Sequence, residues 1–537
     1  MAFELRDRDL LGRIGRLKTK GGIVETPAFM PVINPITQII PPKRMRKEFR
    51  INIVITNSYL TRKNFGDIPD LDVHRLLDFD GIIMTDSGAY QILVYGGIEV
   101  TQTEIIEYQK LIGSDIGVML DIPTGWDVAR ENVEYTVDET LRRAAAALPL
   151  IMDSDTLWVG PVQGGRHLDL VAKSAKVIGG MPFQIYALGS PTEVMERYMF
   201  PILVDMIVTA KRNLPPDRPL HLFGAGHPMM FSLAVALGCD LFDSASYALY
   251  AENGRYLTPH GTLRLEGVSY LPCSCPICKK YTAEELKTAT KGERERLLAE
   301  HNLHACMTEI DVIKQAIVEG SLWDLIERRS RGHPAMTSAL KRLRMYREDL
   351  EKVSPGFKGR GVFYYDQQSL ARPEVTRYRR LLTENYQRPS YSEKLLLVTT
   401  PPHKPFDGSE EYRRLHRYLV NELREALEKL HICFYAAPYG VIPVELCETY
   451  PLSQYEISEP FDIETLNHTA AAVDSYINGS GYTAVYLYRG REELDDVVES
   501  YLMDTCEETR MNLITIWNND PWCEDAFTTL ANTLKTH

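Results

Sequence analysis

The chain has 537 residues, of which 44% are hydrophobic and 25% are charged, and its formal net charge is −13. This length exceeds what one compact core normally supports, so we expect a large domain with one or two smaller ones. No apolar run approaches the roughly 18 residues that a membrane span needs, and the first residues, MAFELRDRDLLGR, carry charges of both signs, unlike a signal peptide. We therefore expect a cytoplasmic protein with no membrane partner.

The acidic charge is concentrated in one part of the chain. Residues 381–537 contain 12 Lys/Arg and 26 Asp/Glu, whereas residues 1–380 contain 48 and 47. Within the balanced part, residues 328–360 carry ten Lys/Arg and three Asp/Glu. A basic run is most often a solvated helix face, but it also suits a strip of contacts to nucleic-acid phosphates. The negative total therefore does not exclude a nucleic-acid partner.

Short β-rich runs, separated by helix-length segments, recur from residue 53 to residue 244. Successive runs begin about 20 to 40 residues apart, which is the spacing of β-crossover-β units in a parallel sheet. A (β/α)8 TIM barrel and a doubly wound open sheet both give such a series, and of the two we expect the barrel. The predicted strands are 53–57, 82–86, 117–121, 157–163, 184–189, 221–226 and 239–244.

The remaining chain predicts an insert, a boundary and a second domain. A Cys-rich insert at about 265–310 and a basic helical stretch complete a catalytic domain over residues 1–350. Residues 351–380 are expected to form a basic linker, because SPGFKGRG is rich in Gly and Pro. Residues 381–537 are expected to form a separate acidic α/β domain. Its predicted elements are strands at 395–400, 432–438, 483–488 and 513–518 and a helix over 412–430.

A metal site is indicated by CSCPICKK, which places Cys273, Cys275 and Cys278 in a C-x-C-x-x-C arrangement, followed by HNLH. Zinc prefers four soft or borderline ligands in a tetrahedron, and Cys3His is a standard closed set. His301 and His304 are both candidates for the fourth ligand. A closed set leaves no open coordination position, so we expect one structural Zn2+. Nine cysteines, an odd number, also favour a metal site over a disulfide framework.

Nearly every predicted strand of the first domain ends in a polar residue or glycine. The carboxyl ends of barrel strands line one mouth, so Asp86 in IMTDSGAYQ and Asp243 in LFDSAS are expected to converge there. Two facing carboxylates can divide the work at an anomeric carbon, one attacking and the other moving protons. The alternative for either aspartate is helix N-capping, which contributes about 1 kcal/mol.

Three further side chains suit a planar ligand at this mouth. Tyr90 lies one helical turn after Asp86, so its ring either covers such a ligand or packs in the core. Asp121 and Gln163 are expected to read the ligand edge, because a carboxylate accepts from a guanine-like N–H and an amide donates to a carbonyl.

The motifs TDSGAYQ, LDIPT, GPVQGG, HLFGAGHPMMFSLAVALGCDLFDSASYALYA and CSCPIC…HNL together resemble the tRNA-guanine transglycosylases, and the stretch around Asp243 resembles the archaeal branch. The resemblance covers roughly residues 1–345 and implies a TIM barrel with a zinc module. Archaeal members exchange guanine at position 15 of the tRNA D-arm for 7-cyano-7-deazaguanine (preQ0), on the way to archaeosine.

The resemblance also implies residue roles. Asp243 matches the nucleophile at ribose C1′ and Asp86 the general acid/base, in a double displacement that needs no ATP or redox cofactor. The zinc set favours His301 over His304. The implied base-binding residues are Tyr90, Asp121, Gln163, Gly189 and Phe223, and the implied zinc ligands are Cys273, Cys275, Cys278 and His301.

The expected partners are tRNA, guanine or preQ0, and a second copy of the chain in a homodimer. Full-length archaeal members usually continue into a basic PUA domain, which the acidic residues 381–537 do not resemble. We therefore expect tRNA affinity to come from the barrel and the basic strip 328–360, with a separate PUA-domain protein as a candidate partner. Charge reversal among Arg328, Arg329, Arg331, Lys341, Arg342 and Arg344 should then weaken tRNA binding.

Three rival functions are considered. A queuine-type transglycosylase acting in the anticodon loop would use the same chemistry. A non-catalytic tRNA-binding subunit is disfavoured because both Asp86 and Asp243 are present. A metal-dependent barrel hydrolase is disfavoured because the strand ends lack His clusters.

Overall fold

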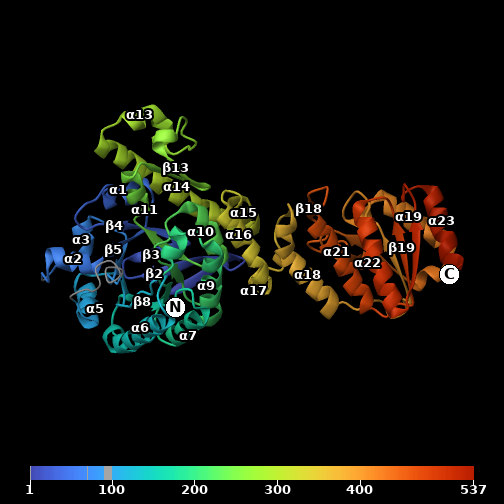
Figure 1. Ribbon diagram of the computed structural model, residues 1–537, viewed down its shortest axis with the longest axis horizontal. Helices are drawn as coiled ribbons and strands as arrows, with labels where there is room; N and C mark the ends of the chain where they lie inside the picture. Colours follow the sequence, from blue (N-terminus) through green and yellow to red (C-terminus); the bar gives the residue numbers. More distant parts are fainter. Residues whose placement is uncertain (1, 69, 90–99, 537) are drawn as a thin grey trace. The chain divides into compact units, whose positions relative to one another are not determined.

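The computed structural model describes residues 2–68, 70–89 and 100–536. The chain divides into two compact units, Met1–Tyr346 and Arg347–His537, each with its own layers of helices and strands (Figure 1). The stretch 351–380, expected to be a linker, contains strand β14 (Val362–Tyr364) and the first part of helix α18 (Pro373–Glu384) of the second unit.

The first unit is a closed barrel of eight parallel strands in the order β10-β11-β4-β5-β6-β7-β8-β9. The predicted TIM barrel is confirmed, and the open sheet is excluded because β9 pairs with β10. All seven predicted strands are present, and one further strand, β4, precedes them. The strands are β4 (Ala28–Ile33), β5 (Ile53–Asn57), β6 (Ile82–Asp86), β7 (Ile116–Val118), β8 (Leu157–Val162), β9 (Ile185–Leu188), β10 (Leu220–Leu222) and β11 (Leu241–Ser244).

The barrel strands form because their apolar side chains fill the interior, where Met30, Ile55 and Met84 are among the buried residues. A three-stranded antiparallel sheet, β1 (Phe3–Asp9), β2 (Gly12–Thr19) and β3 (Gly22–Thr26), precedes β4. Its Phe3 and Leu17 belong to the same buried cluster as the barrel interior. Because β3 leads directly into the start of β4, this sheet covers the amino-terminal end of the barrel. The mouth at the carboxyl ends of the strands is the opposite end.

Helices surround the barrel (Figure 1), and local sequence defines their ends. Asn57 ends β5 and caps helix α2, since its side chain accepts a hydrogen bond from Leu60 N at 2.9 Å. Thr101 and Glu104 form a capping box at the start of α5. The helices between barrel strands are α1 (Pro42–Glu48), α2 (Ser58–Phe65), α3 (Val73–Leu77), α5 (Gln102–Leu111), α6 (Arg130–Ile151), α7 (Leu168–Gly179), α8 (Thr192–Glu196), α9 (Phe200–Asn213) and α10 (Pro228–Ala236).

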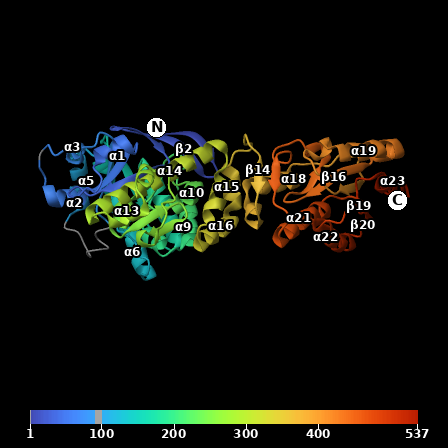
Figure 2. The same ribbon diagram turned by 90° about the horizontal axis from the view of Figure 1, so that it is seen from above.

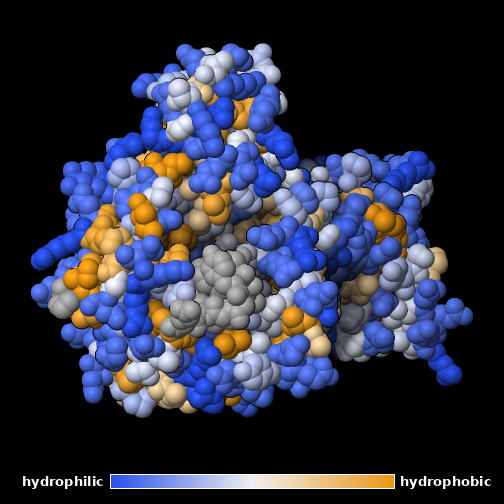
Figure 3. All heavy atoms as spheres, turned by 60° about the vertical axis from the view of Figure 1, so that its left-hand side comes forward, coloured by the Kyte–Doolittle hydropathy of each residue, from blue (hydrophilic) through white to orange (hydrophobic). Residues whose placement is uncertain are grey.

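After the barrel, helix α11 (Ser246–Glu252) and hairpin β12 (Arg255–Thr258) and β13 (Gly261–Arg264) lead into an extension. The extension contains η1 (Leu265–Gly267), α12 (Pro276–Lys280), α13 (Ala283–Thr288) and the start of α14 (Lys291–Glu319). Around α13 it projects from the barrel, and its surface is mainly hydrophilic (Figure 3). The unit ends with α15 (Leu322–Ser330), α16 (Pro334–Leu343) and η2 (Arg344–Tyr346).

The second unit contains a five-stranded sheet in the order β17-β16-β15-β19-β20, with β17 antiparallel to β16. The four predicted strands correspond to β15 (Lys394–Val398), β16 (Leu430–Ala436), β19 (Ala484–Arg489) and β20 (Asn512–Trp517), whereas β17 (Gly440–Pro443) was not predicted. Helices α21 (Ile463–Asn478) and α22 (Glu493–Thr509) lie on one face, and α19 (Glu410–Leu423) and α23 (Glu524–Thr536) on the other (Figure 2). The predicted separate α/β domain is thus confirmed.

The single helix predicted over 412–430 is wrong. Helix α19 ends at Leu423, and a short helix, α20 (Glu425–Glu428), follows. Arg424 interrupts them with φ 47° and ψ −119°, a positive-φ conformation that an α-helix cannot continue through.

Other short elements complete the second unit. Strand β14 pairs in parallel with β18 (Tyr455–Ile457).

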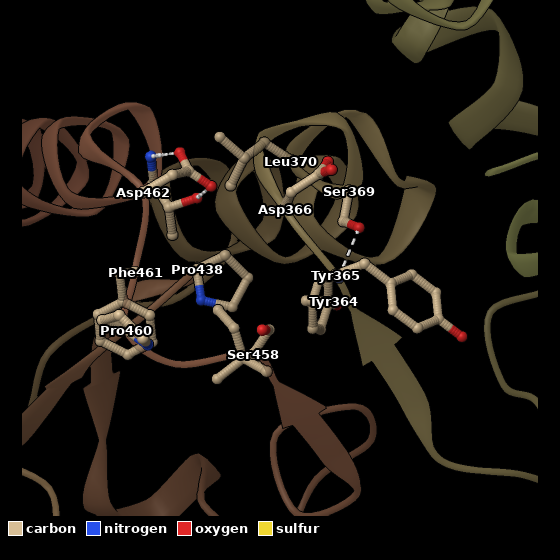
Figure 4. Close-up of a pocket in the computed structure, with 12 residues that line it drawn as sticks. Tyr364, Tyr365, Asp366, Ser369, Leu370, Pro438, Ser458, Pro460, Phe461 and Asp462 are labelled. Atoms are coloured by element: carbon tan, nitrogen blue, oxygen red, sulfur yellow. Dashed lines mark hydrogen bonds between the residues drawn. The ribbon is translucent and has the colours of Figure 1, made fainter. Parts of the chain in front are cut away.

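A cavity of about 220 Å3 lies near the ends of these two strands, with Tyr364, Ser369 and Asp462 on its wall (Figure 4). Asp462 caps α21 through Thr465 N, so this carboxylate has a structural role. The remaining elements are α17 (Arg347–Val353), η3 (Gln367–Ala371), η4 (Phe406–Gly408) and η5 (Val444–Leu446).

Candidate functional site

The carboxyl ends of six neighbouring barrel strands, β6 to β11, bring the predicted site residues to one mouth. Asp86 ends β6, and Asp121 follows β7. Gln163 and Gly189 directly follow β8 and β9. Phe223 follows β10, and Asp243 lies on β11. Tyr90, expected to stack on the ligand, lies outside the described residues.

Asp86 is positioned by its strand neighbour. Asn57 pairs with Asp86 in the β5–β6 register, and its Nδ2 donates to Asp86 Oδ2 at 3.3 Å. Gly88 N donates to the same oxygen at 3.2 Å. Burial, together with the nearby carboxylates of Asp121 and Asp243, raises the pKa of Asp86 to about 7. Asp86 can therefore exchange a proton close to neutral pH.

Asp243 is held by two donors from the adjoining strand and its loop. His221 Nε2 lies 2.8 Å from Asp243 Oδ1, and Gly224 N donates to the same oxygen at 2.9 Å. Helix α11, which follows, has Ala245 at its N-cap and no side-chain cap. The Asp243 side chain therefore does not cap this helix. It is 13% exposed and remains accessible from the mouth.

Asp121 and Gln163 form a direct pair, with Gln163 Nε2 donating to Asp121 Oδ2 at 2.5 Å. Gln163 Oε1 accepts from Ser190 Oγ at 2.8 Å and from Thr124 N at 3.2 Å, which fixes the orientation of the amide. Burial raises the pKa of Asp121 to about 6, and the hydrogen bond from Gln163 opposes that increase. The pair presents a carboxylate and an oriented amide to the mouth, which suits an amide-like ligand edge.

Gly189 is required by close packing. A Cβ atom at this position would lie 2.2 Å from Gln163 Nε2, so any side chain would displace the amide. Phe223 packs on the top of the buried barrel cluster, and its ring meets the His221 ring edge-on at a centroid distance of 4.5 Å. Phe223 therefore places an aromatic ring at the carboxyl end of β10.

Two residues of this site were missed by the sequence analysis. His221 sits inside the apolar run LHLF, where a fully buried histidine is itself a signal of a specific partner. Ser190 donates a hydrogen bond to Gln163 from a backbone with φ 62°. No local sequence pattern predicts this backbone conformation or this contact.

Cys273, Cys275, Cys278 and His301 form a cluster whose four candidate ligand atoms all lie within 4.8 Å of one another. His301 Nε2 lies 3.0 Å from Leu257 O, to which it donates, and this leaves Nδ1 facing the thiols. Such a bond to the outer nitrogen is the usual way to orient a metal-binding imidazole. The cluster can bind a metal ion.

His304, the other candidate ligand, points elsewhere. Its ring packs against Phe49 in a tilted arrangement at a centroid distance of 4.3 Å. The His301 ring instead stacks on Tyr256 at 3.5 Å. The structure therefore places His301, and not His304, with the cysteines.

The basic strip 328–360 divides into paired and exposed side chains. Arg329 forms two hydrogen bonds of 2.8 Å to Glu309, and Arg342 binds Asp205 at 2.7 Å. Arg328 and Lys341 are exposed. The exposed members are the ones available to a polyanion, whereas Arg329 and Arg342 hold the helices together.

Fold and site together define a (β/α)8 barrel protein with carboxylates at its mouth and a Cys3His cluster. Residues 8–335 match the queuine tRNA-ribosyltransferase family, and residues 375–534 match a domain of unknown function, DUF5591. Because the first match covers more than half of the chain, the chain belongs to the queuine tRNA-ribosyltransferase family. The resemblance seen in the motifs, and the expectation of a pentosyltransferase, are confirmed.

Similar proteins cover most of the chain. The tRNA-guanine(15) transglycosylase of Aeropyrum pernix is 45% identical over 91% of this chain and 95% of its own length. The tRNA-guanine(15) transglycosylase of Methanosarcina barkeri is 46% identical over 87% of this chain and 89% of its own length. That of Methanocaldococcus jannaschii is 44% identical over 86% of this chain and 70% of its own length. Every helix among the described residues is too short or too polar to cross a lipid bilayer.

Proposed function

We propose that this protein is a tRNA-guanine(15) transglycosylase, which replaces guanine at position 15 of the tRNA D-arm with preQ0 in archaeosine biosynthesis. The observation that carries the proposal is the convergence of Asp86 and Asp243 at a mouth that also holds the Asp121–Gln163 pair. The names of relatives at 41–46% identity support the same reaction and the same tRNA position.

In the first half-reaction, a carboxylate oxygen of Asp243 attacks C1′ of the target nucleotide. The bond from C1′ to this oxygen forms, and the C1′–N9 bond breaks with its electron pair leaving on guanine. Asp86 supplies the proton that the departing base needs. With a pKa of about 7, Asp86 is protonated in a large share of molecules near neutral pH.

In the second half-reaction, preQ0 replaces guanine in the same pocket. Its N9 proton passes to the Asp86 carboxylate, N9 bonds to C1′, and the bond between C1′ and Asp243 breaks. Two inversions at one carbon give net retention, as in a retaining glycosidase. The covalent intermediate conserves the energy of the glycosidic bond, so no ATP or redox cofactor is required.

The Asp121–Gln163 pair is proposed to recognise the base. Asp121 accepts from the N–H and amino group of the guanine-like edge, and Gln163 donates to its carbonyl. Ser190 keeps Gln163 Oε1 turned away, so that Nε2 faces the ligand. Tyr90 and Phe223 are the proposed aromatic walls, and Gly189 lines the pocket. Extrusion of the target base from its stack costs a few kcal/mol, which these contacts offset.

The metal is proposed to be one structural Zn2+. Three thiolates and one imidazole form the closed tetrahedral set that zinc prefers, and the set leaves no position for substrate. Zinc would hold α12 to α14 and keep the hydrophilic extension folded, without taking part in the chemistry.

The tRNA is proposed to bind over the barrel mouth and the exposed part of the basic strip, including Arg328 and Lys341. A homodimer and a separate PUA-domain protein remain proposed partners. The residue-level division 1–350, 351–380 and 381–537 and the cytoplasmic location also remain proposals.

The closest alternative is a queuine-type exchange in the anticodon loop, which the name of the matching family, queuine tRNA-ribosyltransferase, favours. A non-catalytic tRNA-binding subunit is disfavoured because both proposed catalytic carboxylates are present and face one pocket.

The test is incorporation of radiolabelled guanine into an unmodified tRNA transcript, followed by displacement with preQ0, for wild type and Asp243→Ala. We expect label at position 15, its displacement by preQ0, and a fall of at least about 10⁴-fold in the variant. Label in the anticodon loop would favour the queuine-type alternative. Absence of label from a folded wild-type chain, with or without cell extract, would favour the binding subunit.

A further inference from the structure

The Asp243 carboxylate is held asymmetrically. Both hydrogen bonds that reach it from the described residues, from His221 Nε2 at 2.8 Å and from Gly224 N at 2.9 Å, end on Oδ1. Within the same part of the chain, Oδ2 has no partner. The two oxygens of one carboxylate are therefore different before any substrate arrives.

The surroundings of His221 determine which proton it carries. The side chain is completely buried on β10, and its Nδ1 has no hydrogen-bond partner among the described residues. A proton on Nδ1 would leave a buried donor unsatisfied, which is unfavourable. The proton therefore sits on Nε2, where it is donated to Asp243 Oδ1.

The Phe223 ring meets the His221 ring edge-on at 4.5 Å and limits its rotation. Phe223 also packs against the buried barrel cluster. The imidazole is thus a fixed donor in an apolar setting, where a hydrogen bond to a charged group is stronger than in water.

We propose that His221 is a positioning residue for the nucleophile: together with Gly224 N–H it anchors Oδ1, and this selects Oδ2 as the atom that bonds to ribose C1′. The proposal rests on the transglycosylation proposed above. It assigns a role to a residue that touches neither the base nor the ribose and acts through Asp243.

The same two donors serve both half-reactions. When the bond from Oδ2 to C1′ forms, Oδ1 becomes the carbonyl oxygen of the glycosyl ester and keeps its hydrogen bonds. When the incoming base attacks, the C1′–Oδ2 bond breaks and its electron pair returns to the carboxylate. The donors then stabilise the charge that reappears, without having to reorganise. Loss of the His221 donor should therefore lower kcat more than it changes KM for tRNA.

Matched variants separate this role from simple packing. His221→Gln keeps an N–H group near the position of Nε2. His221→Met has nearly the same length and no N–H group, and the amide of His221→Asn is too short to reach Asp243, so both variants are donor-free toward Asp243. Either donor-free variant suffices if it folds, and thermal unfolding identifies the one that does.

The experiment measures steady-state guanine exchange and, without incoming base, the covalent enzyme–tRNA adduct on a denaturing gel. We expect kcat of the donor-free variants to fall about 10²- to 10³-fold, the range for losing one preorganised donor, with KM for tRNA within about threefold. His221→Gln should recover most of kcat and of the adduct formation rate. Equal loss in the Gln and donor-free variants, or unchanged kcat in a folded donor-free variant, would overturn the positioning role.

The wild-type protein separates this failure from failure of the proposed function. An active wild type that forms an adduct, beside equally active donor-free variants, would remove only the role of His221. A folded wild type with neither exchange nor adduct would remove the proposed function and the role of His221 with it.

Discussion

Asp86 at the barrel mouth and Glu374 in the second unit are both carboxylates in buried surroundings, and their neighbours shift their pKa values in opposite directions. Burial and the carboxylates of Asp121 and Asp243 raise the pKa of Asp86 to about 7. Burial would also raise the pKa of Glu374, but Lys358 and Arg372 hold it at about 2. Lys358 Nζ lies 2.9 Å from Glu374 Oε1.

This difference in pKa separates a carboxylate suited to catalysis, Asp86, from one that stabilises the fold, Glu374. No ion pair to Asp86 occurs within the described chain, so its protonation remains adjustable near neutral pH. Glu374 is a permanent anion that ties β14, α18 and their neighbours together. A buried acid left without a cation points to chemistry, and one with two cations points to structure.

Of the variants that test this comparison, Asp86→Asn should have the largest effect on exchange. Loss of the proton carrier is expected to slow guanine exchange by about 10²- to 10⁴-fold, measured with labelled guanine. Asp80→Asn is the matched control, because that side chain is 83% exposed and should leave exchange unchanged.

The Asp86→Asn variant should also be more stable than the wild type at alkaline pH. The folded pKa of about 7 lies above the ordinary 3.8, so the stability contribution of Asp86 falls as pH rises from about 4 through about 7. Asn has no charge to bury, so Asp86→Asn should gain about 1–4 kcal/mol at pH 8 and progressively less toward pH 4. Chemical unfolding at both pH values measures this, and an equal gain at each would contradict the assignment.

Replacement of the histidine ligand should have a smaller effect on exchange. His301→Ala should lower bound zinc from one ion per chain to a small fraction and reduce exchange by roughly tenfold. His304→Ala removes a ring only three positions away that packs on Phe49, and should retain the metal. Metal analysis of both purified variants decides the outcome; zinc lost from His304→Ala and kept in His301→Ala would reverse the assignment.

Replacement of Glu374 by Gln should leave exchange per folded molecule unchanged and lower the stability of the second unit. Lys358 and Arg372 would lose their buried anion, and this should cost about 3–5 kcal/mol of unfolding free energy. Because the folded pKa lies below the ordinary 4.5, this contribution is complete at neutral pH and lost only on acidification toward about 2.

Glu384→Gln is the control for that change. Its side chain is 59% exposed and pairs with Arg380, which is 43% exposed, so the expected change is under about 0.5 kcal/mol. If the two glutamine variants unfold alike, the ion pairs of Glu374 do not stabilise the unit.

Much of the barrel could be predicted from sequence because a parallel strand buried on both faces is a short apolar run with a polar end. Strand β4 was missed because its sequence, AFMPVI, contains Pro31, which weakens a strand prediction. The break in the helix predicted over 412–430 depends on one backbone angle at Arg424, in a stretch whose amphipathic pattern continues.

The candidate site was predictable where its residues follow strands directly, as Asp86 and Gln163 do. The contacts that orient these residues were not predictable, because they join distant segments. Ser190 reaches Gln163 across 27 positions, and His221 reaches Asp243 across 22. The pairing of Glu374 with Lys358, 16 positions away, was not predictable from sequence either.

The sheet β1–β3, which covers the amino-terminal end of the barrel, has a consequence for the order of events in the proposed exchange. With that end covered, the outgoing guanine and the incoming preQ0 share the opening over which the tRNA lies. The proposed covalent bond to Asp243 would keep the tRNA from dissociating while guanine leaves the site and the incoming base enters it. Free guanine would compete with preQ0 for entry through this opening. The rate of turnover would therefore depend on the ratio of the two bases in solution as well as on the rate of the chemical steps.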